Sequence, residues 1–190
     1  MRRCSTWGSK ILSAGHWVTR RMLETERLIL SELSYDDCEF IFDLVNEPSF
    51  KRYIGDRGVR TLDDAQGYLR KGPIGSYENH GFGLYLVSLR DDEMPLGICG
   101  LVKREEFDYP DLGFAFLERH WAKGYAYESS VAAIEHAGKQ LGLTHILAMV
   151  DGDNASSRRL LEKLGFHFEQ MVRMPGGSED ICGYALDIKT

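Results

Sequence analysis

The sequence predicts a single α/β domain with a central, mixed but mostly antiparallel sheet flanked by helices. Three observations lead to this fold class. The chain has 190 residues, a length that suits one domain with a sizeable core. Short apolar strand patterns are interspersed with amphipathic helical patterns along the chain. The sequence contains no internal repeat, low-complexity tract or linker that would divide it into several domains.

The first half of the domain is predicted to combine strands with two capped helices. Ser34 and Thr61 each precede an aspartate by three positions, which is the capping-box pattern of a helix N-terminus. The second helix should end where Gly72-Pro73-Ile74-Gly75 breaks it. Residues that the first helix should bury are Phe40, Ile41, Leu44 and Val45. Strands are expected at 27–33, 82–89, 96–103 and 111–117.

The second half contains the longest predicted helix, which begins after Gly124 and ends near Gly142. Steps of four, three, four and three residues place one set of side chains on the face expected to meet the sheet: Tyr127, Val131, Ile134, Gly138 and Leu141. A shorter helix at 154–164 is capped by Asp153 or Asn154. The remaining strands are expected at 145–150, 166–171 and 181–187, with Pro175-Gly176-Gly177 between the last two.

Composition excludes several classes of protein. Hydrophobic residues make up 43% and charged residues 27%, as in ordinary soluble proteins. No apolar run approaches the roughly 18 residues of a membrane span. The four cysteines lie far apart and lack zinc-ligand spacing, so we expect no metal site and reduced thiols in a cytoplasmic protein.

Charge is unevenly distributed along the chain. Residues 1–23 contain five basic residues and no acid, so the rest carries −11, since the total is −6. An acidic body disfavours nucleic acid as a partner and suits a cationic amine or basic peptide, although surplus acid also simply favours solubility. We expect residues 1–21 to form a poorly packed basic extension, either an organelle transit peptide or an upstream addition, before a domain at 22–190.

The most informative motif is Trp121-Ala122-Lys123-Gly124-Tyr125-Ala126, which follows the strand pattern Asp111-Leu112-Gly113-Phe114 and precedes the long helix. The first N–H groups of a helix lack internal partners, and the helix dipole favours an anion there. Small residues in the turn let a pyrophosphate approach the backbone closely. This arrangement predicts a phosphate-binding turn.

Two further blocks accompany this motif in order: Glu24-Thr25-Glu26-Arg27-Leu28 and Asp153-Asn154-Ala155-Ser156-Ser157 with Leu164-Gly165-Phe166. Together the three blocks resemble the GNAT N-acetyltransferase superfamily, and more narrowly its ribosomal-protein N-terminal acetyltransferases. The resemblance extends from Met22 to the C-terminus. It implies the GNAT fold, acetyl-CoA as co-substrate, and a monomer or homodimer.

The resemblance also implies which residues bind acetyl-CoA. The N–H groups from Ala122 to Ala126, Tyr125 included, would hold the pyrophosphate, and Lys123 would add charge unless it is a solvated loop residue. The main chain of Phe116 and Leu117 would pair with the pantetheine arm like an added strand. Asn154 would bond the pantetheine region and Ser157 would lie near the sulfur, with helix capping as the alternative and Ser156 as the neighbouring candidate.

Catalysis needs a route for proton removal from the attacking amine. Asp111 is the first candidate for the base, through a water, and pairing with a neighbouring cation is its alternative role. Many superfamily members carry a tyrosine that acts as general acid where this chain has Leu161. Here the acid is another group, such as the Ser157 hydroxyl or a water, or the thiolate leaves unprotonated. The ribosomal-protein enzymes use a downstream glutamate as base, and at the corresponding position this chain has Gly176.

The acceptor is expected to be a primary amine, and three alternatives remain open. The first is a protein or peptide N-terminus, and the second is a small amine such as an amino acid, a polyamine or an amine-bearing toxin. The third is a non-catalytic acyl-CoA-binding module, which the missing tyrosine and glutamate keep open. Tyr53 and Tyr77 are candidates to line the acceptor pocket.

Overall fold

The computed structural model describes residues 21–174 and 180–189. Most of the predicted basic extension and the Pro175-Gly176-Gly177 segment therefore lie outside the described residues. The first described residue, Arg21, begins a strand that pairs with the next one along the chain. Within the described ranges, no helix is both long and apolar enough to cross a membrane.

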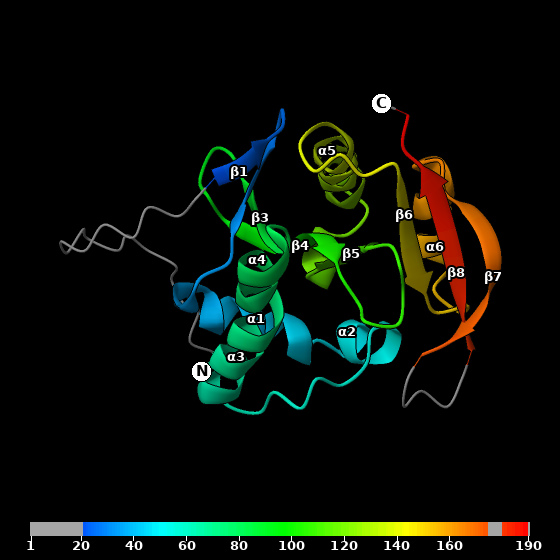
Figure 1. The fold of residues 1–190 in the computed structure, drawn as a ribbon. Helices are drawn as coiled ribbons and strands as arrows, with labels where there is room; N and C mark the ends of the chain where they lie inside the picture. The colour runs from blue at the N-terminus through cyan, green and yellow to red at the C-terminus, as the bar shows by residue number, and fades with distance from the viewer. Residues whose placement is uncertain (1–20, 175–179, 190) are drawn as a thin grey trace.

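An eight-stranded sheet forms the centre of the domain (Figure 1), in the order β1-β2-β3-β4-β5-β6-β8-β7. Every neighbouring pair is antiparallel except β5 and β6, which confirms the predicted mixed and mostly antiparallel sheet. The strands are β1 Arg21–Glu24, β2 Leu28–Glu32, β3 Leu84–Leu89, β4 Pro95–Val102, β5 Asp111–Phe116, β6 His145–Val150, β7 His167–Arg173 and β8 Asp180–Asp187.

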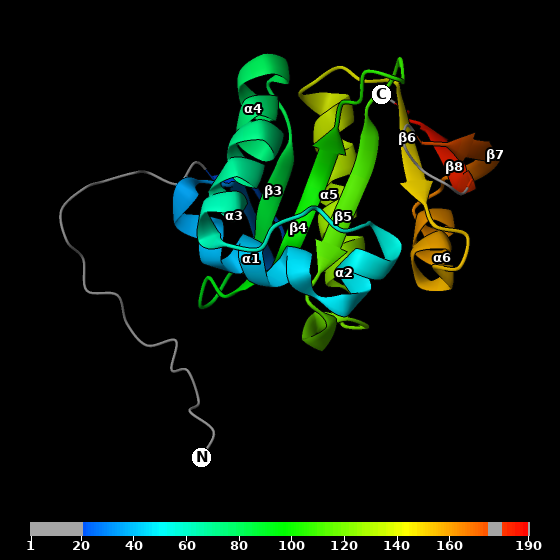
Figure 2. The same cartoon turned by 90° about the horizontal axis from the view of Figure 1, so that it is seen from below.

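Helices cover both faces of the sheet (Figure 2). One face carries α1 Cys38–Asn46, α2 Pro48–Tyr53, α3 Leu62–Leu69 and α4 Gly75–His80, and the other carries α5 Tyr125–Lys139. The short α6, Ala155–Lys163, packs beside β6. Because strand side chains alternate between faces, one core lies under α5, around Val87 and Ala133, and a second lies under α1 and α3, around Ile41 and Leu69.

Both predicted capping boxes are present. Ser34 caps a 3₁₀ turn, Tyr35–Asp37, which leads directly into α1, and Thr61 caps α3. The four residues expected in the core from α1 are all buried. These local predictions are confirmed. In a capping box the hydroxyl and the carboxylate accept hydrogen bonds from backbone N–H groups that have no partner within the helix.

The α-helix α3 ends at Leu69, but Gly72-Pro73-Ile74-Gly75 does not interrupt the helical path as predicted. The helix continues through a π-helical turn, Arg70–Ile74, directly into α4. In an α-helix a proline ring clashes with the carbonyl four residues earlier and cannot donate a hydrogen bond. The wider π turn accommodates Pro73, since Gly75 N–H reaches back to the Arg70 carbonyl.

The face of α5 that meets the sheet also differs from the prediction. The buried residues are mostly small: Ser129, Ser130, Ala133, Ala137 and Gly138. Of the predicted set Gly138 is buried, Ile134 and Leu141 are partly exposed but pack against the core under α5, and Tyr127 and Val131 are partly exposed. Small side chains let the helix approach β4 closely, with Ser130 Oγ 3.7 Å from the buried Cys99 Sγ. The serines satisfy themselves locally, as Ser129 Oγ donates to the Tyr125 carbonyl at 2.9 Å.

The parallel pair β5–β6 separates almost as soon as it forms. Asp111 and Leu147 are the single paired positions, supported by a 3.0 Å bond from Leu147 N to the Pro110 carbonyl. Further along, β5 pairs only with β4 on its other edge, and Leu117 N still donates to the Leu96 carbonyl at 3.1 Å. Because alternate residues of a strand face opposite edges, the main chain of Phe114 and Phe116 faces the gap toward β6.

Candidate functional site

A single cavity of about 780 Å³ runs along this gap and continues beneath α2, α3 and α4. Its volume lies within the range of small-molecule and cofactor sites. It brings together eight of the ten residues expected from the sequence: Asp111, Phe116, Ala122, Gly124, Tyr125, Ala126, Asn154 and Ser157. Leu117 and Lys123 do not line it.

The turn before α5 has the backbone geometry of an anion site. Ala122 and Gly124 both adopt left-handed conformations, with φ of 58° and 84°. Such alternation turns successive N–H groups toward one side, and α5 then begins at Tyr125 with its first N–H groups unpaired by the helix. Two features favour glycine at position 124. Its φ strains any larger residue, and a Cβ there would lie 3.3 Å from the Arg27 guanidinium.

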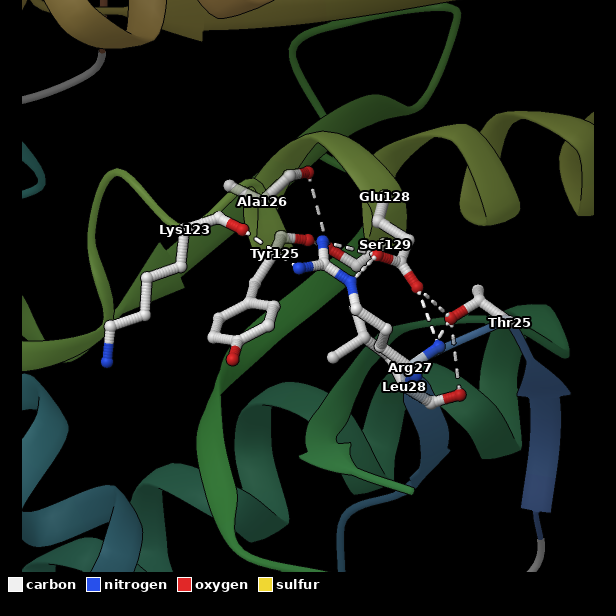
Figure 3. A network of polar contacts seen from close by, with 8 residues as sticks. All are labelled: Thr25, Arg27, Leu28, Lys123, Tyr125, Ala126, Glu128 and Ser129. Carbon is white, nitrogen blue, oxygen red and sulfur yellow. Dashed lines mark hydrogen bonds and ion pairs between the residues drawn. The ribbon is translucent and has the colours of Figure 1, made fainter. Parts of the chain in front are cut away.

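Arg27 clamps this turn from the opposite end of the sequence (Figure 3). Its guanidinium donates to the Lys123 carbonyl at 3.1 Å and to Glu128 Oε2 at 2.7 Å, and it lies 4.9 Å from the Tyr125 ring centroid. Thr25 Oγ1 completes the network with a 2.6 Å bond to Glu128 Oε1. This contact explains why the Thr25-Glu26-Arg27 block accompanies the turn motif: it ties β1 and β2 to the first turn of α5.

Electrostatics keeps Glu128 ionised within that network. Burial alone would raise the pKa of Glu128, but the bonds from Thr25 and Arg27 outweigh it and lower this pKa. The Lys123 side chain extends away from these groups (Figure 3) and is exposed. Lys123 therefore serves the turn through its carbonyl, and a contribution of its charge stays a prediction.

The main chain of Leu117 is not available for the predicted pairing with the pantetheine arm. Its N–H donates to Leu96 and its carbonyl accepts from His120 N at 2.9 Å, so both groups are engaged within the protein. The side chain is only 1% exposed. Phe116 and Phe114, whose main chains face the gap, are the residues placed to pair with an extended ligand. The Phe116 carbonyl already accepts one bond, at 2.8 Å, from Nε1 of the half-exposed Trp121.

Asn154 and Ser157 lie together at the start of α6, across the gap from β5. Asn154 is the helix cap, since its Oδ1 accepts from Ser157 N at 3.1 Å and from Ser156 Oγ at 2.9 Å. The capping role is thus present, and it resolves the choice between Asp153 and Asn154. The Asn154 amide nitrogen and the Ser157 hydroxyl have no bond to any residue that the structure describes, and both residues line the cavity.

Asp111 lies at the narrow end of the gap and is only 2% exposed. Arg104 binds it with both nitrogens, Nε to Oδ1 at 2.7 Å and Nη2 to Oδ2 at 3.2 Å. The alternative pairing with a cation is therefore present as well. Burial raises the pKa of Asp111, and the Arg104 guanidinium offsets part of that rise. Asp111 nevertheless lines the cavity.

The two tyrosines predicted to line the acceptor pocket differ in position. Tyr53 lines the cavity as expected, whereas Tyr77 does not. The Tyr77 hydroxyl accepts from Leu33 N and donates to the Leu84 carbonyl, so it holds β2 and β3 to α4 instead. Leu161 is 1% exposed and lines the cavity with a hydrocarbon side chain, so no acid stands at that position.

Sequence reasoning missed the side chains of the far wall. Arg57, Tyr68, Lys71, Lys103 and Arg104 all line the cavity, and none belongs to a motif. His120 also lines the cavity, is 6% exposed, and its Nε2 has no bond to a described residue. Burial, together with Arg119 and Lys123, lowers the pKa of His120.

Splayed strands that lead to a glycine turn and a helix N-terminus define a protein that binds an extended, phosphate-bearing ligand. A family profile, the acetyltransferase (GNAT) domain, matches residues 27–167. The chain therefore belongs to the GNAT acetyltransferase family and is an acyltransferase that uses acetyl-CoA. The left-handed turn, which a Cβ at Gly124 would obstruct, fits this co-substrate.

Individual relatives agree with this assignment. The uncharacterized N-acetyltransferase YoaA of Bacillus subtilis is 29% identical over 80% of this chain and 86% of its own. An acetyltransferase structure from Agrobacterium tumefaciens is similar with a TM-score of 0.74 and 24% identity, covering 94% of this chain and 99% of that one. RimL, a ribosomal L7/L12 alpha-N-protein acetyltransferase, is similar in structure with a TM-score of 0.77 and 14% identity, covering 94% of this chain and 100% of that one.

Proposed function

We propose that this enzyme transfers acetyl from acetyl-CoA to the α-amine of a peptide or protein N-terminus, by direct attack in a ternary complex. The observation that carries the proposal is one continuous cavity, which joins the anion-binding turn at Gly124 to the buried carboxylate of Asp111. A cavity of this kind holds donor and acceptor at once, so that no covalent enzyme intermediate is needed.

On this proposal the two sides of the gap hold acetyl-CoA. The N–H groups of the turn from Ala122 to Ala126 bind the pyrophosphate, with Lys123 as a nearby charge. The main chain of Phe114 and Phe116 pairs with the pantetheine arm. Across the gap, the Asn154 amide donates to the same arm and the Ser157 hydroxyl lies near the sulfur. Acetyl-CoA supplies the activated thioester carbonyl.

The proposed general base is a carboxylate, which is a weak base and therefore favours an α-amine as the acceptor. An α-ammonium has a pKa of about 8, whereas an aliphatic ammonium has one of about 10.4. Asp111, acting through a water, takes the proton of the amine, whose nitrogen forms the new C–N bond as the C–S bond breaks. The leaving thiolate has an ordinary pKa of about 8.5, so it needs at most the Ser157 hydroxyl or a water as proton donor, which suits a site with leucine at position 161.

The named activity of the RimL neighbour supports a protein N-terminus as acceptor.

The three free cysteines described by the structure fit the predicted cytoplasmic location, since reducing compartments keep thiols unpaired.

The test is thiol release from acetyl-CoA by the purified full-length protein over two acceptor panels. One panel holds peptides with free N-termini and the same peptides with blocked N-termini. The other holds amino acids, polyamines and aminoglycosides. Release with free but not blocked peptides is the expected result. Release with small amines alone would replace the peptide acceptor by a small molecule, and acetyl-CoA binding without release would favour a non-catalytic module.

A further inference from the structure

The acceptor side of the cavity is basic, although the chain as a whole carries −6. Four cationic side chains line it: Arg57, Lys71, Lys103 and Arg104. Asp111 is the one carboxylate among the described lining residues. Arg104 already pairs with Asp111, so the other three cations that line the cavity have no carboxylate left to pair with among the described lining residues.

None of these three cations forms an ion pair with a carboxylate among the described residues. The Lys103 ammonium donates to the carbonyls of Phe107 and Asp108, which hold it in place without cancelling its charge. Arg57 and Lys71 form no ion pair within the described ranges. They also border a second hollow that contains Asp63 and Asp64. Asp64 is engaged there by the backbone N–H groups of Arg60 and Thr61.

These cations lie away from the site proposed for the cofactor phosphates. Lys103 and Arg104 lie beside Asp111 at the start of β5, whereas the Gly124 turn lies beyond its end. Five strand steps from Asp111 to Phe116 span roughly 16 Å. Arg57 and Lys71 come from the segments that follow α2 and α3, on the sheet face opposite to α5 (Figure 2).

We propose, building on the proposed function, that the acceptor carries an anionic group, a carboxylate, close to its α-amine, and that Arg57, Lys71 and Lys103 bind it. Cations in a partly enclosed cavity attract a carboxylate more strongly than they would in open water, and they repel polyamines and basic peptides. This reverses the preference for a cationic substrate that the overall acidic charge suggested. The carboxylate belongs either to an acidic residue near a peptide N-terminus or to a free acidic amino acid.

Initial rates with matched peptides test the charge preference. The peptides share a free N-terminal serine and differ only at positions two and three, which are both aspartate, both alanine or both lysine. Glutamate and glycinamide provide the small-molecule arm. We expect kcat/KM to be about tenfold higher for the aspartate peptide than for the lysine peptide, an amount equal to about 1.4 kcal/mol. Equal rates, or a preference for lysine, would overturn the proposal.

A charge-removal variant identifies the cations responsible. In Arg57→Gln/Lys71→Gln, the ratio of kcat/KM for the aspartate peptide to that for the alanine peptide should fall about tenfold, while KM for acetyl-CoA stays unchanged. The matched control is Arg70→Gln, an exposed neighbour that does not line the cavity and should keep the ratio. Thermal unfolding checks that each variant folds. A rise in the acetyl-CoA KM with the ratio retained would assign the cations to the cofactor and refute the proposal.

The outcomes separate this proposal from the proposed function. Turnover of all three peptides at equal rates would keep the peptide acceptor and reject the anionic group. Turnover of glutamate but not glycinamide, with no peptide active, would reject the peptide acceptor and support the anionic group from a free amino acid.

Discussion

At the end of the cavity where we propose that acetyl-CoA binds, the groups are backbone amides of one short turn, 122–126, of which all residues but Lys123 line the cavity. At the other end they are side chains of Arg57, Lys71, Lys103 and Asp111, which come from three separate segments. A backbone turn is specific for a phosphate because of its conformation, and it is indifferent to most side chains. A wall of side chains can change charge by single substitutions. The proposed donor end therefore depends on backbone conformation, whereas the proposed acceptor end depends on side-chain charge.

Gly124→Val should break the donor end with the largest effect. Valine at a φ of 84° is strained by about 1–3 kcal/mol and its Cβ approaches Arg27, so the N–H groups of the turn no longer converge. We expect acetyl-CoA affinity, measured by calorimetry, to fall at least about 100-fold. Gly142→Val is the control, because Gly142 also has a positive φ but lies outside the cavity. Normal binding by Gly124→Val would refute the placement of the pyrophosphate.

Asp111→Asn should impair the chemical step while leaving the donor end intact. Loss of a general base lowers kcat by about 100-fold or more. Acetyl-CoA affinity should be unchanged, and the acid limb of the pH–rate profile should disappear. The same kcat with the acid limb retained would show that Asp111 only pairs with Arg104.

Arg104→Gln sharpens that test through pH. Burial raises the pKa of Asp111 and Arg104 lowers it, so removing the guanidinium should raise this pKa further. A base must be deprotonated to work, and the acid limb of kcat/KM should therefore move to higher pH. The pH dependence of the initial rate measures this shift. An unmoved limb would mean that another group titrates.

Glu128→Gln should loosen the donor end without touching the ligand. Gln loses the charged bonds to Thr25 and Arg27 that hold the turn, and we expect KM for acetyl-CoA to rise about tenfold. Glu135→Gln is the matched control on the same helix, since it removes only an exposed pair with Lys139. Equal effects of the two variants would remove Glu128 from any positioning role.

The smallest expected effect is on stability. The pKa of Glu128 is lowered in the folded state, so its ionisation stabilises the fold above the unfolded pKa, and this contribution is lost as pH falls through the folded pKa. Because Arg27 is 45% exposed and solvent screens the pair, we expect only about 1 kcal/mol. Denaturant unfolding of Glu128→Gln should show less stability at neutral pH and a flatter decline in acid. A parallel decline to that of the unchanged protein would contradict this linkage.

The difference between a local backbone turn and a wall of distant side chains also explains which features the sequence could predict. The Gly124 turn, the Asn154 cap and the Ser34 and Thr61 capping boxes depend on residues a few positions apart, so pattern alone predicted them. The contact between Arg27 and Glu128 spans 101 positions, and its sequence block was noticed without its structural reason.

Other features depend on packing that a one-dimensional pattern does not contain. A π turn at Pro73 stands where a break was predicted, because the wider turn accommodates the proline while the Gly75 N–H still reaches the Arg70 carbonyl. The close face of α5 consists of serine, alanine and glycine, which a search for large apolar residues passes over. The cations of the acceptor wall have no spacing rule at all, since the fold alone brings them together.

The most direct test of the two-ended cavity is a matrix of initial rates in which acetyl-CoA and the aspartate peptide are varied together. It compares the unchanged enzyme with Glu128→Gln and with Arg57→Gln/Lys71→Gln. Our account predicts that the first variant raises KM for acetyl-CoA alone and that the second raises KM for the peptide alone. The reverse pattern, or a rise in both constants for both variants, would contradict it.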